Sequence, residues 1–514
     1  MNKNCNLSDL FKNESEWKKQ YLKLKLLLEN INIIINQEKC NNDDISEQLV
    51  FIENELMKVF TYSKLLYNIN LNNKNNIEKY NKALRLIKLY NNILTVLFNN
   101  DSIEENYEIN MEKAYNSFLK LNLNNKFKSK EITINVSTYI KELNDNKNNK
   151  SIIQKKFNKY YQDNSDLFFK FLLNYVQNKN SLSQTYTFTN PYIEFLDKNG
   201  ISSNKINNFI RNIHSNTNFL SNFINIKTKS KNKQINFYDL DVLNYDNNIT
   251  FSYDQSISII MSSLKKLGCK YVSIAKKAFY EGWIDSSFSN DKINIPMCIN
   301  CPDIHPYIII NYKGTLKDIF NLTHELGHAI NCYISSNGNQ NNILSEISSN
   351  VHEFLLYEYL YENNLFDKRC LEEFLLEKIR LDLFRQSISF ELERYIYTIK
   401  NIDKNKIMSY YMNLIRKYYG NEIIYPNMVK YSLFSNPNLY NCFNSIKYPI
   451  GIIGGYYFFS KLNNDNNIKE YISFLKENIL DYKDFYNKFK INFMSEKIMK
   501  KFFIEIFKYI NEVS

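Results

Sequence analysis

Two histidines and a glutamate near residue 325 have the spacing of a zinc-binding motif. Residues 323–329 read T-H-E-L-G-H-A, so His324 and His328 stand four residues apart and Glu325 follows the first of them. On a helix the two imidazoles face the same side and can bind one zinc ion, while Glu325 faces the metal-bound water as a general base. The alternative is that both are ordinary core histidines. Against it, the chain has only five histidines, and two of them lie here.

A catalytic zinc site needs a third protein ligand and an open coordination position. Glu346 lies 18 residues after His328 and can supply that ligand from a second helix. Glu353 follows seven residues later on the same helix face, where its carboxylate can accept a hydrogen bond from an imidazole and orient it. Two acids at this spacing are commonplace on a solvated helix face. After H-E-x-x-H they indicate a site for one zinc ion per chain, bound by His324, His328 and Glu346.

The residues before the motif predict the elements that position it. Residues 307–312 form a short β-branched run typical of a strand, and Lys313-Gly314 ends it. Thr315 has the place of an N-cap and Asp318 that of a capping-box acid. Apolar residues then recur at helical spacing until Asn337-Gly338, and a second helix is expected over 344–360.

Helical spacing of apolar residues extends over most of the chain, and the 10 glycines and 7 prolines are too few for a many-stranded sandwich. A polar break is expected at 70–76, a polar insert at 144–150, a boundary near Asn190-Pro191 and a linker at 227–233. The remaining helices are expected at 6–69, 77–97, 106–178, 253–267, 368–398, 404–419, 468–478 and 482–511.

Composition excludes several classes of protein. The net charge is +11, but the lysines are scattered among asparagines and acids, as on a solvated surface, and no aromatic and basic motif for nucleic acid accompanies them. The eight cysteines lack a disulfide framework, and the single C-x-x-C pair, Cys298 and Cys301, favours reduced structural thiols over a redox pair or half a zinc site. No apolar signal core or membrane-length apolar run is present. These features predict a cytoplasmic protein that binds neither nucleic acid nor membrane.

The motif and its surroundings resemble the thimet-oligopeptidase-like zinc metallopeptidases, and more closely their oligoendopeptidase F branch. The resemblance rests on residues 324–328 with 346–353, and extends to 6–17, 237–240, 282–285, 305–318, 385–386 and 390–393. It implies a mainly α, multi-helical, clam-like fold with a small β element beside the zinc helix and a deep central cavity. It also implies an N-terminal helical region over 1–190, whose second part is 106–190, and a zinc metallopeptidase catalytic domain over 191–514.

The activity that this resemblance implies is that of a zinc-dependent endopeptidase. Its substrates would be short, unfolded oligopeptides, and its oligomeric state is not indicated. Zinc-bound water would be activated by Glu325, which would pass the proton to the leaving amine.

The C-terminal segment departs from the family pattern, in which histidine and tyrosine residues close over the substrate. Residues 438–451 align without a gap, but Asn438 stands in place of the histidine, and Asn444 and Ile446 stand in place of tyrosines. Tyr448 is the candidate for donating to the oxyanion, with simple packing as the alternative, and Tyr440 and Asn438 are candidates for substrate binding. The loop at 291–297 also lacks the glycines and arginine of the family.

Two functions therefore stay open. The first is a working zinc oligopeptidase with altered substrate contacts. The second is a metal-binding but weakly active or inactive relative that binds peptides or a partner protein. The presence of Glu325 favours the enzyme, because a binding protein has no need for a general base beside the metal.

Overall fold

The computed structural model describes residues 3–36, 42–97, 150–229, 235–241, 250–301, 303–335 and 342–511, together with residues 111, 114, 115, 118, 127–129 and 132–134. The expected insert at 144–149, the linker residues 230–233 and the helix stop at Asn337-Gly338 lie outside this set.

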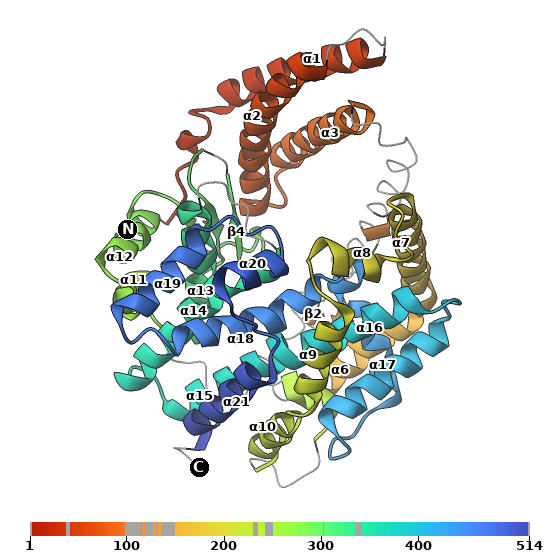
Figure 1. Cartoon of the computed structure of the whole chain (residues 1–514), viewed down its shortest axis with the longest axis vertical. Helices are drawn as coiled ribbons and strands as arrows, with labels where there is room; N and C mark the ends of the chain where they lie inside the picture. The colour runs from red at the N-terminus through yellow and green to blue at the C-terminus, as the bar shows by residue number, and fades with distance from the viewer. Residues whose placement is uncertain are drawn as a thin grey trace.

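The protein is mainly α-helical, as the sequence predicts (Figure 1). Its helices are α1 (Glu14–Asn36), α2 (Asn42–Ile69), α3 (Lys74–Leu97), α6 (Lys150–Asp163), α7 (Ser165–Thr185), α8 (Pro191–Lys198), α9 (Ser203–His214), α10 (Asn218–Lys229), α11 (Tyr253–Ser263), α12 (Cys269–Tyr280), α13 (Leu316–Ile334), α14 (Glu346–Glu362), α15 (Lys368–Ile379), α16 (Gln386–Thr398), α17 (Lys404–Tyr419), α18 (Lys447–Phe459), α19 (Asp465–Lys476), α20 (Tyr482–Phe489) and α21 (Glu496–Asn511). In the described part of the chain, none of them has the length and apolarity that crossing a membrane requires.

The strands are few and short. Strands β1 (Phe127–Ser129) and β2 (Ile132–Ile134) pair with each other, while β3 (Ile284–Asp285), β5 (Tyr307–Ile309) and β4 (Met297–Ile299) form a three-stranded sheet in that order. Strand β5 pairs parallel to β3 and antiparallel to β4. Three residues of β5 are fully or almost fully buried, which explains the continuous β-branched run in the sequence. The expected small β element before the zinc helix is therefore present.

Helices α1 to α3 form an arm that projects from the main body (Figure 1). Their buried side chains, including Trp17, Leu24 and Val59, form one hydrophobic cluster with Ile299 of β4 and Tyr307 of β5. The second and larger cluster extends from Ala114 to Ile506 and contains the helices of the body. The sheet thus joins the arm to the body.

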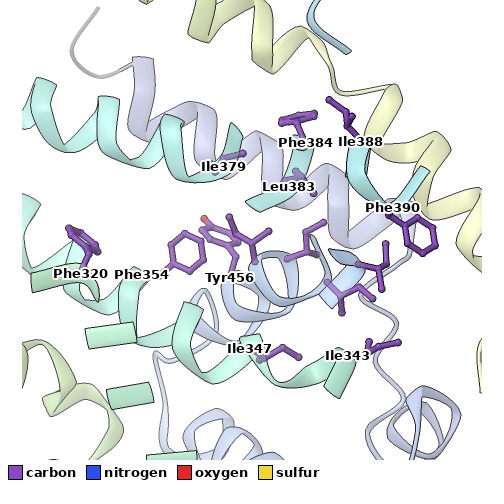
Figure 2. Close-up of a cluster of buried hydrophobic side chains, with 14 of the residues drawn as sticks. Phe320, Ile343, Ile347, Phe354, Ile379, Leu383, Phe384, Ile388, Phe390 and Tyr456 are labelled. Atoms are coloured by element: carbon purple, nitrogen blue, oxygen red, sulfur yellow. The ribbon is translucent and has the colours of Figure 1, made fainter. Parts of the chain in front are cut away.

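Helix α14 lies at the centre of the body, against α13 on one side and α18 on the other (Figure 1). Every residue from Glu346 to Tyr357 is buried. Figure 2 shows Ile347 and Phe354 of α14 directed into a cluster that also holds Tyr456 of α18 and residues of α15 and α16. The rings of Phe354 and Tyr456 meet edge to face, with centroids 5.1 Å apart. A helix buried on all sides can carry charged groups only where they find partners, and Glu346 and Glu353 are such groups.

Several expected helices are interrupted. The stretch 106–178 contains strands β1 and β2, and it divides again at Asn164 between α6 and α7. The stretch 368–398 divides into α15 and α16, which are joined by a π-helical segment, Arg380–Arg385. The stretch 482–511 divides into α20 and α21 at Lys490, whose φ of 56° is left-handed and ends α20. The spacing of apolar residues indicates which face of a helix is buried. It continues across the latter two breaks, so it does not indicate where one helix ends and the next begins.

The predicted helix start at Asn190-Pro191 is confirmed. The predicted break at 70–76 is present but shorter, because α3 begins at Lys74, and the expected linker at 227–233 is wrong for 227–229, which continue α10.

Candidate metal centre and active site

Helix α13 holds His324 and His328 on one face. A complete capping box starts the helix, in which the Thr315 hydroxyl accepts from the Asp318 backbone N–H and the Asp318 carboxylate accepts from the Thr315 backbone N–H. The predicted cap is thus confirmed. The two Nε2 atoms lie 3.2 Å apart, so both imidazoles point at the same place.

Helix α14 comes close enough to add a third donor because Gly327 has no side chain. A Cβ on Gly327 would lie 2.6 Å from Cα of Ser349, which is too close for any other residue. The second glycine contact lies on the far side of α14, where a Cβ on Gly451 of α18 would lie 2.3 Å from Cβ of Glu346. Glu346 is therefore held between two closely packed helices.

The carboxylate of Glu346 faces both imidazoles. Its Oε2 atom lies 3.3 Å from Nε2 of His324 and 3.5 Å from Nε2 of His328. Burial opposes ionisation of Glu346, but His328 and His324 lower the pKa of its carboxyl well below the usual value. One nitrogen from each imidazole and one oxygen of the carboxylate all lie within 4.8 Å of one another.

This donor set fits a zinc ion. Two imidazoles and one carboxylate are a ligand set that leaves a fourth position open, as a catalytic site requires. The Glu346 Oε2 atom is buried and accepts no hydrogen bond, which is costly for a carboxylate oxygen unless a cation takes that place. Among the described residues, no other group of three such side chains converges in this way.

Glu353 orients the first imidazole. Its Oε1 atom lies 2.6 Å from Nδ1 of His324 and accepts from Nζ of Lys378 at 2.9 Å. Lys378 also pairs with Asp382 in the π-helical segment, at 2.8 Å. Burial opposes ionisation of Glu353, but Lys378 and His324 lower the pKa of its carboxyl. The His324 Nδ1 contact leaves Nε2 directed at Glu346, which is the arrangement that metal-binding histidines need.

Glu325 lies on the same helix as the two histidines and is 8% exposed. Burial raises the pKa of its carboxyl, with smaller opposing contributions from His324 and His328. A carboxylate with a raised pKa is a better proton acceptor at neutral pH than an ordinary glutamate. Its environment therefore suits a general base.

Tyr448 lies beside the metal ligands, at the start of α18, and is half-buried. Burial raises the pKa of its hydroxyl, and Glu346, Asp382 and Glu325 raise it further because their negative charges are near. The hydroxyl thus keeps its proton at neutral pH and can act as a hydrogen-bond donor.

The structure places the other two candidates in different surroundings. Tyr440 is 6% exposed, and its ring stacks on Phe118 with centroids 4.3 Å apart, within an aromatic cluster beside α7. Its hydroxyl donates to the Phe168 carbonyl at 3.4 Å. The Asn438 amide donates to Oε1 of Gln386 at 2.8 Å. Tyr440 is thus enclosed by aromatic side chains, whereas Asn438 is half-buried and bonded to α16, and substrate binding by either residue stays a prediction.

The two other departures from the family pattern have structural roles. Asn444 accepts a hydrogen bond from the Asn342 amide at 2.9 Å. Ile446 is fully buried in the main cluster. Neither position carries a hydroxyl group, and Ile446 has no side-chain hydrogen-bond donor of any kind.

Four contributors to the site belong to no motif that the sequence displays. Lys378 reaches Glu353 from α15, and Lys447 reaches Glu346 from α18. Gly451 and Gly455 recur at helical spacing in a chain with only 10 glycines. This spacing indicates a close helix approach, because small residues four apart on one face allow two helix backbones to come near each other.

Comparison with known proteins agrees with this geometry. The profile of Peptidase family M3 matches residues 140–503. The oligoendopeptidase F homologue of Borreliella burgdorferi is 26% identical over 341 residues, which cover 62% of this chain and 58% of that protein. The oligopeptidase PepF of Bacillus subtilis is 25% identical over 304 residues, which cover 56% of this chain and 45% of that protein. The chain thus spans about half the length of these curated relatives.

A solved structure shares the fold over almost the whole chain. The crystal structure of oligoendopeptidase-F from Enterococcus faecium superposes with a TM-score of 0.70 at 15% identity, covering 97% of this chain and 98% of that one. At this identity the likeness concerns the fold alone. The profile match includes both histidines and Glu346, and it extends over most of the sequence. The chain belongs to Peptidase family M3.

Proposed function

We propose that this protein is a zinc-dependent endopeptidase that hydrolyses internal peptide bonds of short, unfolded oligopeptides. One observation carries the proposal: the donor atoms of His324 and His328 on α13 and of Glu346 on α14 converge within 4.8 Å, and α13 also carries the buried carboxylate of Glu325. Family membership supports the reaction class. The relatives named oligopeptidases and oligoendopeptidases support short peptides as substrates.

His324, His328 and Glu346 would hold one zinc ion per chain. When bound, zinc supplies a Lewis acid that polarises the attacking water and the scissile carbonyl. Glu325 takes a proton from the water and delivers it to the leaving amine. Tyr448 donates a hydrogen bond to the oxygen on which negative charge develops. Glu353 keeps the His324 ring in its orientation throughout.

Replacement of Glu325 tests the proposal. Glu325→Gln should keep zinc affinity within a few-fold and lower kcat by roughly 100- to 10,000-fold, because the amide cannot accept the proton. The measurement is cleavage of a quenched-peptide library by the zinc-loaded wild type and variant, with zinc content determined for both. A variant that cleaves at nearly the wild-type rate would contradict the assignment of Glu325.

A second candidate is a relative that binds peptides or a partner protein with little or no turnover. It is favoured by Asn438, Asn444 and Ile446, which stand where the resemblance leads one to expect a histidine and two tyrosines. Wild-type protein that binds one zinc ion and cleaves no peptide in the library would support this candidate. Cleavage by the wild type alone would exclude it.

We further propose a cytoplasmic location and no nucleic-acid or membrane partner. Cys298 and Cys301 carry free thiols, which supports a reducing compartment. The spread of the lysines along the chain supports a solvated surface rather than a nucleic-acid site.

A further inference from the structure

Lys447 contacts the carboxylate oxygen of the third metal ligand that the histidines do not contact. It is the first residue of α18, next to Tyr448, and its side chain is 17% exposed. Its Nζ atom lies 3.0 Å from Oε1 of Glu346 and 5.1 Å from the centre of the Tyr448 ring. An ammonium group with so little exposure is stable only beside an anion, and Glu346 is that anion.

The packing of α18 places Lys447 there. Lys447, Gly451 and Gly455 follow one another at intervals of four residues and so share one face of α18. A Cβ on Gly451 would lie 2.3 Å from Cβ of Glu346, and a Cβ on Gly455 would lie 2.4 Å from Cβ of Asn350. The face that carries Lys447 therefore lies directly against α14, with the glycines allowing the close approach.

The two oxygens of Glu346 thus have separate surroundings. Oε1 pairs with Lys447, whereas Oε2 faces the two imidazoles and accepts no hydrogen bond. We propose that Lys447 is a positioning residue for the metal site: it holds Oε1, so that Oε2 is the oxygen presented to zinc. The inference rests on the proposed zinc site and adds a residue to it.

Two effects of Lys447 have opposite signs. Its positive charge repels a divalent cation, so that its removal would tighten zinc binding. Its bond to Oε1 fixes the carboxylate, so that its removal would weaken zinc binding by about 10- to 100-fold, as loss of an outer partner of a ligand does. We expect the second effect to prevail, because Glu346 already offsets the charge of the ammonium at 3.0 Å.

The experiment measures zinc dissociation constants of purified full-length variants by competition with a chromophoric chelator. Lys447→Met should weaken binding by about 10- to 100-fold, and Lys447→Arg should restore most of it, since a guanidinium can also donate to Oε1. Lys461→Met is the matched control, because Lys461 lies just beyond the far end of α18 and contacts Tyr457. It should leave zinc affinity unchanged.

The visible absorption spectrum of the cobalt-substituted protein is a second, independent measurement of the geometry at the metal site. Release of Oε1 in Lys447→Met should change the ligand-field bands, whereas Lys447→Arg and Lys461→Met should keep the wild-type spectrum. Circular dichroism of the metal-free proteins checks folding, and Lys447→Gln replaces Lys447→Met if the latter does not fold. Binding within twofold of the wild type or tighter, or an unchanged spectrum, would overturn the proposal. Neither reading involves peptide cleavage, so wild-type inactivity would contradict the proposed enzyme without affecting this test.

Discussion

At the scale of single residues, two of the three metal-site donors, His324 and Glu346, are held by a partner outside the ligand set, on another element. Glu353 of α14 bonds His324 of α13 and Lys378 of α15, and Lys378 in turn bonds Asp382. Such outer partners fix the orientation of a ligand and raise its affinity for metal. The orientation of His324 therefore depends on three helices and on the π-helical segment.

Replacement of Glu353 should weaken the metal site without removing a ligand. Glu353→Gln should lower zinc affinity about tenfold or more, because a neutral amide is a weaker acceptor for the His324 N–H than a carboxylate. Competition with a chelator measures the change. Glu358→Gln, on the same helix but paired with the exposed Lys266, is the control and should have no effect. Equal affinities of the two variants would contradict this role of Glu353.

At the scale of elements, the glycines of α13 and α18 determine how closely these helices approach α14. Gly451 and Gly455 have almost no space for a Cβ, whereas a Cβ on Gly454 would meet the end of the flexible Ile347 side chain at 2.9 Å. A side chain at Gly451 must therefore move backbone, whereas one at Gly454 meets only side-chain atoms, of Ile347 and Phe493.

Gly451→Ala should destabilise the fold by about 2 kcal/mol or more and weaken zinc binding, because the new methyl group displaces Glu346. Gly454→Ala is the matched control and should cost less in both measurements. Thermal unfolding and chelator competition provide the comparison. An alanine at 451 that is tolerated as well as one at 454 would contradict the close approach of α18 and α14.

The turn before α18 is anchored by a buried glutamate. Glu393 of α16 accepts from the Phe443 backbone N–H at 2.5 Å and from the Ser445 hydroxyl at 2.6 Å. Phe443 has a φ of 58°, a left-handed conformation that a bulky residue adopts only when held in place. Burial raises the pKa of the Glu393 carboxyl to about 8, against opposing hydrogen bonds from Ser445, Phe443 and Ser389.

This raised pKa predicts a pH dependence of stability. Between its ordinary value of 4.5 and about 8, the folded protein binds the proton of Glu393 more tightly than the unfolded chain does. Stability from this group is therefore lost as pH rises through that window, by roughly 1 to 4 kcal/mol. Glu393→Gln cannot titrate, so the free energy of unfolding of the wild type should fall relative to the variant from pH 5 to pH 8. Parallel curves for the two proteins would contradict the raised pKa.

At the scale of the whole molecule, the two hydrophobic clusters divide the chain into an arm and a body. The arm cluster holds α1 to α3 with parts of β4 and β5, and the body cluster holds the helices of the metal site. Helices α6 and α7 pack within the body cluster. The division into a helical region over 1–190 and a catalytic domain over 191–514 stays a prediction.

Damage to the arm should leave the metal site intact. Trp17 is 3% exposed and its indole N–H donates to the Val59 carbonyl at 3.2 Å. Trp17→Ala should remove about 3 to 5 kcal/mol from the arm cluster. Hydrogen exchange should then quicken in α1 to α3 while α13 and α14 keep their protection and zinc affinity stays the same. Loss of protection in α13 would show instead that the two clusters unfold as one.

Most of the correct predictions from the sequence depend on residues that are close together in the chain. The capping box at Thr315, the i, i+4 spacing of His324 and His328, and the β-branched run of β5 each depend on neighbours within a few residues. Such contacts are encoded by spacing alone. The mainly helical fold follows from the same kind of evidence.

Contacts between segments that are far apart in the chain can be identified only from the tertiary structure. Lys378 and Lys447 reach the site because α15 and α18 pack on α14. The spacing of Gly451 and Gly455 indicates a closely packed face of α18, but it does not indicate which helix packs against that face. Tyr440 and Tyr448 are eight residues apart, yet one is enclosed by aromatic rings and the other lies beside the metal ligands. The order of residues determines local conformation, whereas the partners of a buried side chain depend on how helices far apart in the chain pack together.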